Sequence, residues 1–252
     1  MFNRNTLLIV AAAVFAGLGL LAAQHWLDRD ARSGPMLDVV MPFATPRPIP
    51  SFELISADGP VTEASLRGRW TVVFIGFVSC PDICPTTLTD MAKAQRAWEA
   101  LPEAQRPRLL FVSIDPERDS PELIAGYARH FHPETVAATQ PDLARLEAFT
   151  SSLSLVFRKV PMGDSYTMDH SGSMVVLDPE VRVAGVIRPR LPADATPGSG
   201  AIPTIDPQAV ARDLAALAGA DARALRSCCN TCCRTVSCRA SPTVWRARNG
   251  AR

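Results

Sequence analysis

The feature that most constrains this chain is a pair of cysteines at the point where a buried strand gives way to a helix. The apolar run from Thr71 to Val78 has the length and β-branched content of a buried strand. Cys80 and Cys84 follow it, and Pro85 suits the first turn of a helix. We therefore expect a strand, two thiols and a helix in that order.

The spacing of the two cysteines allows them to act together. On a helical turn, residues four apart share a face and their Cα atoms lie about 6.2 Å apart, inside the range of about 4.4 to 6.8 Å that a disulfide tolerates. The free N–H groups at a helix start also favour thiolates, the form that binds a metal or attacks a disulfide. Cys80 and Cys84 can thus be an open dithiol or a bridge. A static disulfide, or two buried small hydrophobes, is the alternative without chemistry.

Length and composition limit the class of protein. The chain has 252 residues, enough for one domain of ordinary size with appendages. Its formal net charge is +1, so there is no excess of Lys and Arg to neutralise nucleic-acid phosphates. No cysteine lies between Cys84 and Cys228, so we do not expect the folded body to be held together by several structural disulfides.

The N-terminal sequence predicts a membrane anchor. Residues 6–23 form an uncharged apolar run just long enough to cross a bilayer core of about 30 Å. Arg4 precedes this run and balanced charges follow it, which favours a cytoplasmic N-terminus. We therefore expect residues 1–27 to be a single-pass anchor in the inner (cytoplasmic) membrane, with the soluble domain on the periplasmic side. A cleaved signal peptide is the alternative.

Proline and cysteine usage sets the limits of the folded domain. Residues 28–50 are rich in proline and predict an extended, semi-rigid linker. Residues 51–220 are expected to form the folded domain that carries the cysteine pair. Residues 221–252 are expected to be a disordered tail, with a second metal site as the alternative, because five cysteines stand there among many arginines: Cys228, Cys229, Cys232, Cys233 and Cys238.

Strands mix with helices within residues 51–220. The apolar runs and turn residues predict a hairpin at 52–62, strands at 71–78, 109–114, 155–160, 174–177 and 181–187, and helices after 84, from 120, at 141–152 and from 206. Together with the cysteine-bearing junction, this order predicts an α/β fold, a thioredoxin-like sandwich.

Four histidines could complete a site with the two thiols. His25 stands at the expected membrane boundary, and His130 and His132 end a helix, where a solvated cap is expected. His170 lies in a polar turn before an apolar strand, where an imidazole would be displayed. Two thiolates and one imidazole make a soft, three-ligand set that suits copper, whereas structural zinc would want a fourth residue.

Three motifs carry a resemblance to a known family. CPDICP after an apolar strand, SIDPERDSPE and YTMDHSGSMVVLDP together resemble the Sco/SenC family of membrane-anchored copper proteins, over residues 52–217. The resemblance implies a thioredoxin-like fold and a copper ion bound by Cys80, Cys84 and His170. It also implies a role in assembling the dinuclear copper centre of cytochrome c oxidase.

The resemblance extends to neighbouring residues and has two departures. It implies that Asp115, Pro116 and Asp169 shape the site without binding the metal. The family usually has Asp-Gly or similar where this chain has Pro179-Glu180-Val181, so this turn must be built another way. The cysteine-rich tail is the second departure.

We therefore expect a membrane-anchored copper chaperone that passes copper by ligand exchange to the copper-bearing subunit of cytochrome c oxidase. Another copper chaperone or a thiol reductase is a further expected partner. Loading requires both thiols to be reduced, so copper and a disulfide exclude each other. The alternative function is a thiol-disulfide reductase that uses Cys80 and Cys84 to keep the oxidase copper-site cysteines reduced and has no need of His170. A thiol peroxidase is disfavoured, because it would use a single nucleophilic cysteine.

Overall fold

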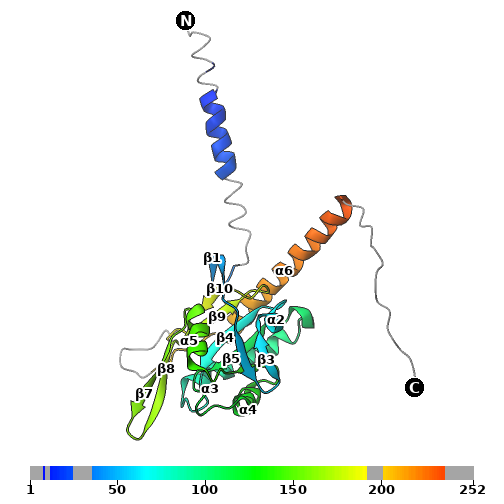
Figure 1. Cartoon of the computed structure of the whole chain (residues 1–252). Helices are drawn as coiled ribbons and strands as arrows, with labels where there is room; N and C mark the ends of the chain where they lie inside the picture. The colour runs from blue at the N-terminus through cyan, green and yellow to red at the C-terminus, as the bar shows by residue number, and fades with distance from the viewer. Residues whose placement is uncertain (1–7, 9–11, 25–35, 192–200, 236–252) are drawn as a thin grey trace, which may run out of the picture. The chain divides into compact units, whose positions relative to one another are not determined.

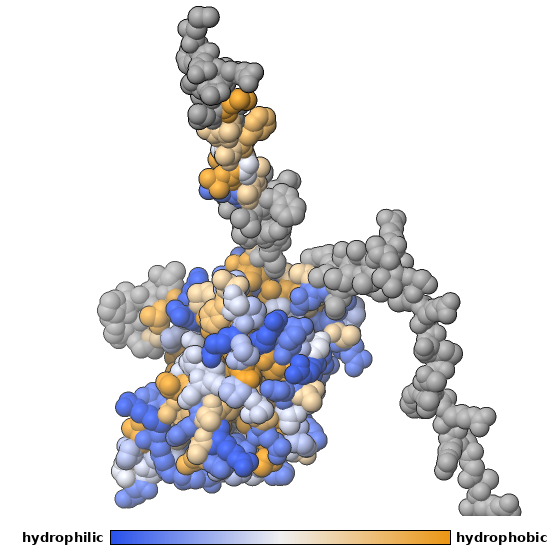
Figure 2. All heavy atoms as spheres, turned by 45° about the horizontal axis from the view of Figure 1, so that its top comes forward, coloured by the Kyte–Doolittle hydropathy of each residue, from blue (hydrophilic) through white to orange (hydrophobic). Residues whose placement is uncertain are grey.

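The computed structural model describes residues 8, 12–24, 36–191 and 201–235 (Figure 1), in two units, Met1–Asp38 and Val39–Arg252. In the first unit residues 12–24 are helical, and their apolar side chains are exposed, among them Phe15 and Leu21 (Figure 2). None of the helices in these described ranges is long and apolar enough to cross a membrane. Part of the predicted span, residues 6–23, lies outside the described residues.

A six-stranded sheet forms the centre of the second unit. Its middle strand, β4, is buried along its whole length. Both faces of the strand are covered, which explains why its sequence is almost entirely apolar. β4 is parallel to β5, which is parallel to β6, whereas β9, β10 and β1 continue the sheet in antiparallel order on the other side. The strand order is β1 (Val40–Pro48), β10 (Arg182–Ile187), β9 (Met174–Leu177), β4 (Thr71–Gly76), β5 (Arg108–Ser113) and β6 (Val136–Ala138).

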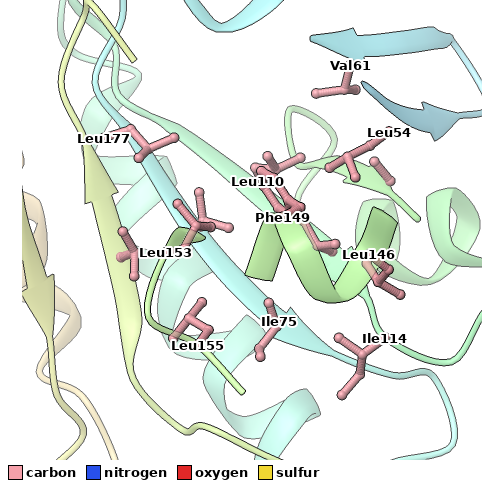
Figure 3. Close-up of a cluster of buried hydrophobic side chains, with 14 of the residues drawn as sticks. Leu54, Val61, Ile75, Leu110, Ile114, Leu146, Phe149, Leu153, Leu155 and Leu177 are labelled. Atoms are coloured by element: carbon pink, nitrogen blue, oxygen red, sulfur yellow. The ribbon is translucent and has the colours of Figure 1, made fainter. Parts of the chain in front are cut away.

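Side chains alternate between the two faces of this sheet. On one face, Val73 and Ile75 of β4 join a cluster with Phe149, shown in part in Figure 3. On the other face, Phe74 packs on Phe111, which packs on Tyr127. The first face is covered by β2 (Glu53–Ser56), β3 (Gly59–Thr62), α2 (Glu63–Leu66) and α5 (Leu143–Ser152); the second by α3 (Ile83–Trp98), α4 (Pro121–Phe131) and α6 (Pro207–Thr235). A short 3-10 helix, η1 (Glu103–Gln105), links α3 to β5. The predicted thioredoxin-like sandwich is confirmed.

A second hairpin stands apart from the main sheet. Strands β7 (Phe157–Met162) and β8 (Ser165–His170) pair only with each other among the described strands and extend from the body of the unit (Figure 1). The register pairs Phe157 with His170. The sequence predicted β7 but not β8, because residues 165–170 are largely polar and lack an apolar run. This hairpin brings His170 to the site.

The predicted linker over residues 28–50 is wrong for Val40–Pro48, which form β1. This strand pairs with β10 in antiparallel orientation, and its first residue, Val40, lies opposite Ile187. Its register shifts between Pro42 and Arg47, and an edge strand tolerates proline at such irregular positions. The prolines in this segment led to the prediction of a linker where the chain forms an edge strand.

The predicted disordered tail is also wrong in part. α6 begins after Asp206, whose carboxylate accepts the backbone N–H groups of Gln208 and Ala209, and it continues to Thr235. Residues 221–235 are thus helical, and residues 236–252, with Cys238, lie outside the described residues.

The turn between β9 and β10 is built by an aspartate instead of a glycine. The buried Asp178 carboxylate accepts the N–H groups of Glu180 and Arg182 at 3.1 and 2.9 Å. Val181 takes the left-handed conformation, with φ of 63°, which a β-branched residue rarely adopts. The expectation that this turn has another construction is confirmed.

Candidate metal centre

The two cysteines lie where β4 leads into α3. The Cys80 N–H donates to the Phe77 carbonyl at 3.3 Å, so Cys80 sits in a turn, and α3 begins only at Ile83. Cys84 lies in the first turn of that helix and is fully buried, whereas Cys80 is half-exposed. The cysteines do not share a helical face as predicted. Both are free thiols.

Cys84 packs directly against the end of β4. A β-carbon added to Gly76 would lie 2.8 Å from the Cys84 sulfur and 2.9 Å from Cε2 of Phe111. Real β-carbons almost never approach a heavy atom this closely, so only glycine allows the sulfur to reach this position. Gly76 is therefore a requirement of the thiol pair that its sequence motif did not reveal.

His170 presents one defined nitrogen to the thiols. Its Nδ1 lies 3.0 Å from the Ser171 carbonyl oxygen, and a carbonyl can only accept, so Nδ1 carries a proton. Nε2 therefore carries the lone pair in the neutral ring, and it faces the Cys84 sulfur at 3.9 Å. The rings of Phe77 and Phe74 hold the imidazole edge-on, with centroids 6.1 and 6.4 Å away. This arrangement orients Nε2 as a ligand.

The two thiols differ in acidity. A hydrogen bond from Cys84 lowers the pKa of Cys80 to about 4, and burial opposes this change. The same hydrogen bond with Cys80, together with burial, raises the pKa of Cys84. The pair thus holds one proton on Cys84 and a thiolate on the more exposed Cys80.

Two of the three proposed ligands, Cys84 and His170, are already spaced to bind one metal. No group of three or more His, Cys, Asp and Glu side chains in the described part of the chain is arranged, as it stands, to hold a metal ion. A metal with bonds of about 2.3 Å to sulfur and about 2.0 Å to nitrogen, at an angle of about 120°, would set those atoms about 3.7 Å apart. Cys84 and His170 are already 3.9 Å apart. The adjustment therefore falls on Cys80, which lies in a turn and interacts with both other groups.

A buried aspartate fixes the loop that carries the cysteines. Asp119 Oδ2 accepts the Val78 N–H at 3.0 Å and the Ser113 hydroxyl at 2.6 Å. Its side chain is almost fully buried, and burial raises its pKa. Asp119 thereby ties the end of β5 to the segment just before Cys80. Its motif, SIDPERDSPE, marked the region but not this role.

Asp115 connects the loop after β5 to the hairpin that carries His170. Its buried carboxylate accepts the Tyr166 hydroxyl at 2.8 Å and forms an ion pair with Arg118. Arg118 in turn donates to the Tyr166 carbonyl at 3.1 Å and stacks on the Tyr166 ring, with Cζ 3.9 Å from its centroid. Lys159 covers the ring at 3.8 Å. Asp115 therefore orients the hairpin without touching the thiols.

The other two residues that the resemblance places around the site are Pro116 and Asp169. Pro116 lines a cavity of about 220 Å³ between its loop and the hairpin. Asp169 is exposed and pairs with Arg158 across the hairpin at 2.9 Å.

His130 and His132 lie apart from the site, and His25 lies outside the described residues. His130 is exposed. His132 is almost fully buried, so the predicted solvated cap is wrong for it. Its Nδ1 accepts the Glu134 N–H at 3.2 Å, and its Nε2 lies 3.1 Å from Glu99.

Comparisons of sequence and of structure with known proteins relate this chain to one family. The SCO1/SenC family profile matches residues 44–197. A Stutzerimonas stutzeri protein named "Putative copper-binding protein" is 35% identical over 76% of this chain and 90% of its own length. The mitochondrial SCO2 homolog of Bos taurus is 31% identical, over 70% of this chain and 66% of its own length.

A solved structure extends this relationship to the fold. The copper-bound structure of Bradyrhizobium japonicum ScoI superposes with a TM-score of 0.54 and 30% identity, covering 68% of this chain and 99% of that one. The profile match covers more than half of the chain, and the motif cysteines and the motif histidine lie within it. This chain is therefore a member of the SCO1/SenC family.

Proposed function

We propose that this protein binds copper through Cys80, Cys84 and His170 and delivers it to the dinuclear copper centre of cytochrome c oxidase. The observation that carries the proposal is the convergence of two free thiols and an imidazole whose Nδ1 is tied to the Ser171 carbonyl, leaving Nε2 3.9 Å from the Cys84 sulfur. Soft sulfur and imidazole ligands suit copper. Copper in the ScoI structure and the name of the Stutzerimonas protein support the same metal.

The copper ion is cargo, so the site must release it as well as hold it. Cys80 is half-exposed and lies in a turn, whereas Cys84 is buried behind it. An incoming thiolate from the copper-bearing subunit would therefore displace Cys80 first, and Cys84 and His170 would follow. In this exchange the acceptor's ligands replace the copper–sulfur and copper–nitrogen bonds one by one, and Cys84 regains from solvent the proton that it gave up on loading.

The first test is copper binding by the reduced and the oxidised protein. One copper per reduced chain at this site is expected, lost when Cys80 and Cys84 form a disulfide and weakened strongly by His170→Ala. A variant with both cysteines replaced by serine reports what the cysteines of the C-terminal tail bind. Equal binding by reduced and oxidised protein, after this subtraction, would contradict the proposal.

A thiol-disulfide reductase is the second candidate, and one observation favours it. Cys80 is the more exposed thiol and has a lowered pKa, as expected for the attacking thiol of a redox pair. Its natural substrate would be the oxidised cysteines of the oxidase copper site. His170→Ala separates the two functions, because it removes a copper ligand and leaves both sulfur atoms. Rapid reduction of a test disulfide by the variant, without copper binding by the wild type, would favour the reductase.

We further propose that residues 1–27 anchor the chain in the inner membrane, with the domain on the periplasmic side. The uncharged run over residues 6–23, with Arg4 before it, supports this location. Alkaline extraction of membranes tests it, with a chain lacking residues 2–27 as the control. Release of the full chain into the soluble fraction would contradict an anchor. A second copper chaperone or a thiol reductase would act on the same periplasmic face to load or reduce the thiols.

A further inference from the structure

The cavity of about 220 Å³ between the loop after β5 and the hairpin that carries His170 has an apolar interior. Its lining includes the buried Ile114 and Met168, the half-buried Phe157, and Leu143, which is 45% exposed. Pockets that hold a whole small molecule usually measure about 300–1,000 Å³. This cavity is smaller, and with an exposed leucine at its edge it suits the entry of a single apolar side chain from another protein.

The hairpin presents this cavity and the proposed ligand His170 on one face. Residues opposite each other in an antiparallel pair point to the same face, and so do residues two apart along a strand. Phe157 lies opposite His170, and Met168, two residues before His170, lies opposite Lys159. A side chain in the cavity would therefore contact the same hairpin face that directs His170 toward the thiols.

The charges around the cavity favour a basic occupant. Lys159 pairs with Glu117 at 2.6 Å, and Arg158 pairs with Asp169 at 2.9 Å. Glu147 of α5 also lines the cavity, and its exposed carboxylate has no ion pair or hydrogen bond in the described part of the chain. The exposed rim therefore offers an unpaired negative charge beside an apolar hollow.

We propose that this cavity is the docking site for the protein that accepts the copper ion. The occupant is a segment of the acceptor with one apolar side chain, which enters the cavity, and a neighbouring lysine or arginine, which pairs with Glu147. This inference rests on the proposed copper delivery. Because Phe157 lies opposite His170, docking here holds the acceptor next to a metal ligand while the acceptor's own ligands displace Cys80.

The test is copper transfer from the loaded full chain to the isolated copper-bearing domain of the oxidase subunit, at increasing concentrations of that domain. The tail cysteines, from Cys228 onward, are replaced by serine in every sample so that one site supplies the copper. Glu147→Lys should raise the half-saturating concentration of the domain about tenfold, because like charges then meet at the rim. Leu143→Trp should raise it as well, because the larger side chain blocks the cavity. Neither change should alter copper affinity.

Glu103→Lys is the matched control, because it makes the same change of charge at an exposed residue far from the cavity. Glu103 lies on η1, before β5 begins, whereas the cavity lies beyond the other end of β5. This variant should transfer copper as the wild type does. Added salt should raise the half-saturating concentration for the wild type and for Glu103→Lys, but not for Glu147→Lys.

The possible failures are distinguishable. Wild-type protein that binds no copper, or passes none to the domain, would overturn this inference together with the proposed function. Wild-type transfer kinetics in both Glu147→Lys and Leu143→Trp would overturn this inference alone, and so would an equal effect of Glu103→Lys. Sedimentation of the wild type without the domain tests a second copy as the occupant, because dimers that Glu147→Lys abolishes would assign the cavity to that copy instead.

Discussion

Gly76 and Cys84 touch so closely that the Cys84 sulfur lies 2.8 Å from the position where any other residue would have its β-carbon. The end of the central strand and the buried ligand are thus a single packed unit. Phe111 fills the other side of the same space, at 2.9 Å. Movement of the Cys84 sulfur therefore depends on the backbone of β4, whereas Cys80 lies outside this contact.

We predict that Gly76→Ala displaces Cys84 and weakens the copper site. The new methyl group should lower the free energy of unfolding by about 1–3 kcal/mol, the usual cost of overpacking a core, and lower copper affinity as well. Gly126→Ala on α4 is the matched control, because nothing lies within 4 Å of its added β-carbon. It should stabilise the protein by about 0.5–1 kcal/mol. Denaturant unfolding and a copper titration of both variants make the comparison, and an intact site in Gly76→Ala would show that the contact is not required.

The second prediction concerns the pH dependence of Cys80. Because the hydrogen bond from Cys84 lowers the pKa of Cys80 to about 4, Cys80 is a thiolate at every pH well above that value. The alkylation rate of Cys80 should therefore stay nearly constant between about pH 5.5 and 8. The alkylation rate of an ordinary thiol falls about tenfold for each unit that the pH is lowered in this range.

Two substitutions at Cys84 test the cause of that acidity. Cys84→Ala removes the donor, so the pH dependence of an ordinary thiol should return at Cys80. Cys84→Ser keeps a donor and should keep much of the flat profile. Mass spectrometry of the peptide containing Cys80 separates this rate from reactions of the tail cysteines. A steep profile in the wild type would disprove the shared proton.

A third prediction follows from the two hydrogen bonds that Asp119 accepts. Asp119→Ala leaves the buried Val78 N–H and Ser113 hydroxyl unpaired, so stability should fall by about 1–3 kcal/mol. Copper affinity should fall too, because the segment before Cys80 loses its attachment to β5. Asp206→Ala is the control, since its carboxylate caps α6 and its loss costs about 1 kcal/mol without touching the ligands. Equal copper affinity in both variants would count against a role for Asp119 at the site.

The fourth prediction is that Asp115 acts on His170 through the hairpin. Asp115→Ala leaves Arg118 without its buried partner and leaves the Tyr166 hydroxyl only its longer contact with Glu117, at 3.4 Å. Amide hydrogen exchange in β7 and β8 should become at least about tenfold faster, equivalent to a loss of about 1.4 kcal/mol, with little change in β4. Arg158→Ala breaks only an exposed ion pair with Asp169 and should change the exchange little. Unchanged hairpin exchange in Asp115→Ala would remove the proposed connection.

The sequence predicted those parts of the structure that have strong local patterns. The apolar run before Cys80 predicted β4, and the Ser120-Pro121 cap predicted α4, where Ser120 accepts the Leu123 N–H. It missed β8 because its residues are polar, and β1 because prolines interrupt it. A local sequence pattern indicates whether a segment is a helix or a strand, but it does not indicate where that strand lies in the sheet.

The site followed the same division between local and long-range information. Cys80, Cys84 and His170 could be proposed as ligands from the sequence, because the cysteine spacing and the family motifs are local in sequence; that assignment stays a prediction. The roles of Gly76 and Asp119 could not be predicted, because they depend on how β4 and the loop after it pack against β5 and the segment that follows β5. The burial of His132 was missed for the same reason.

The most direct test of the central claim is X-ray absorption at the copper edge of the reduced, copper-loaded protein and its His170→Ala variant. The tail cysteines, from Cys228 onward, should be replaced by serine in both so that only one site contributes. The structure predicts two sulfur ligands and one nitrogen ligand per copper in the first sample, and loss of the nitrogen in the second. A copper shell without two sulfur atoms, or an unchanged nitrogen in the His170→Ala variant, would contradict the account.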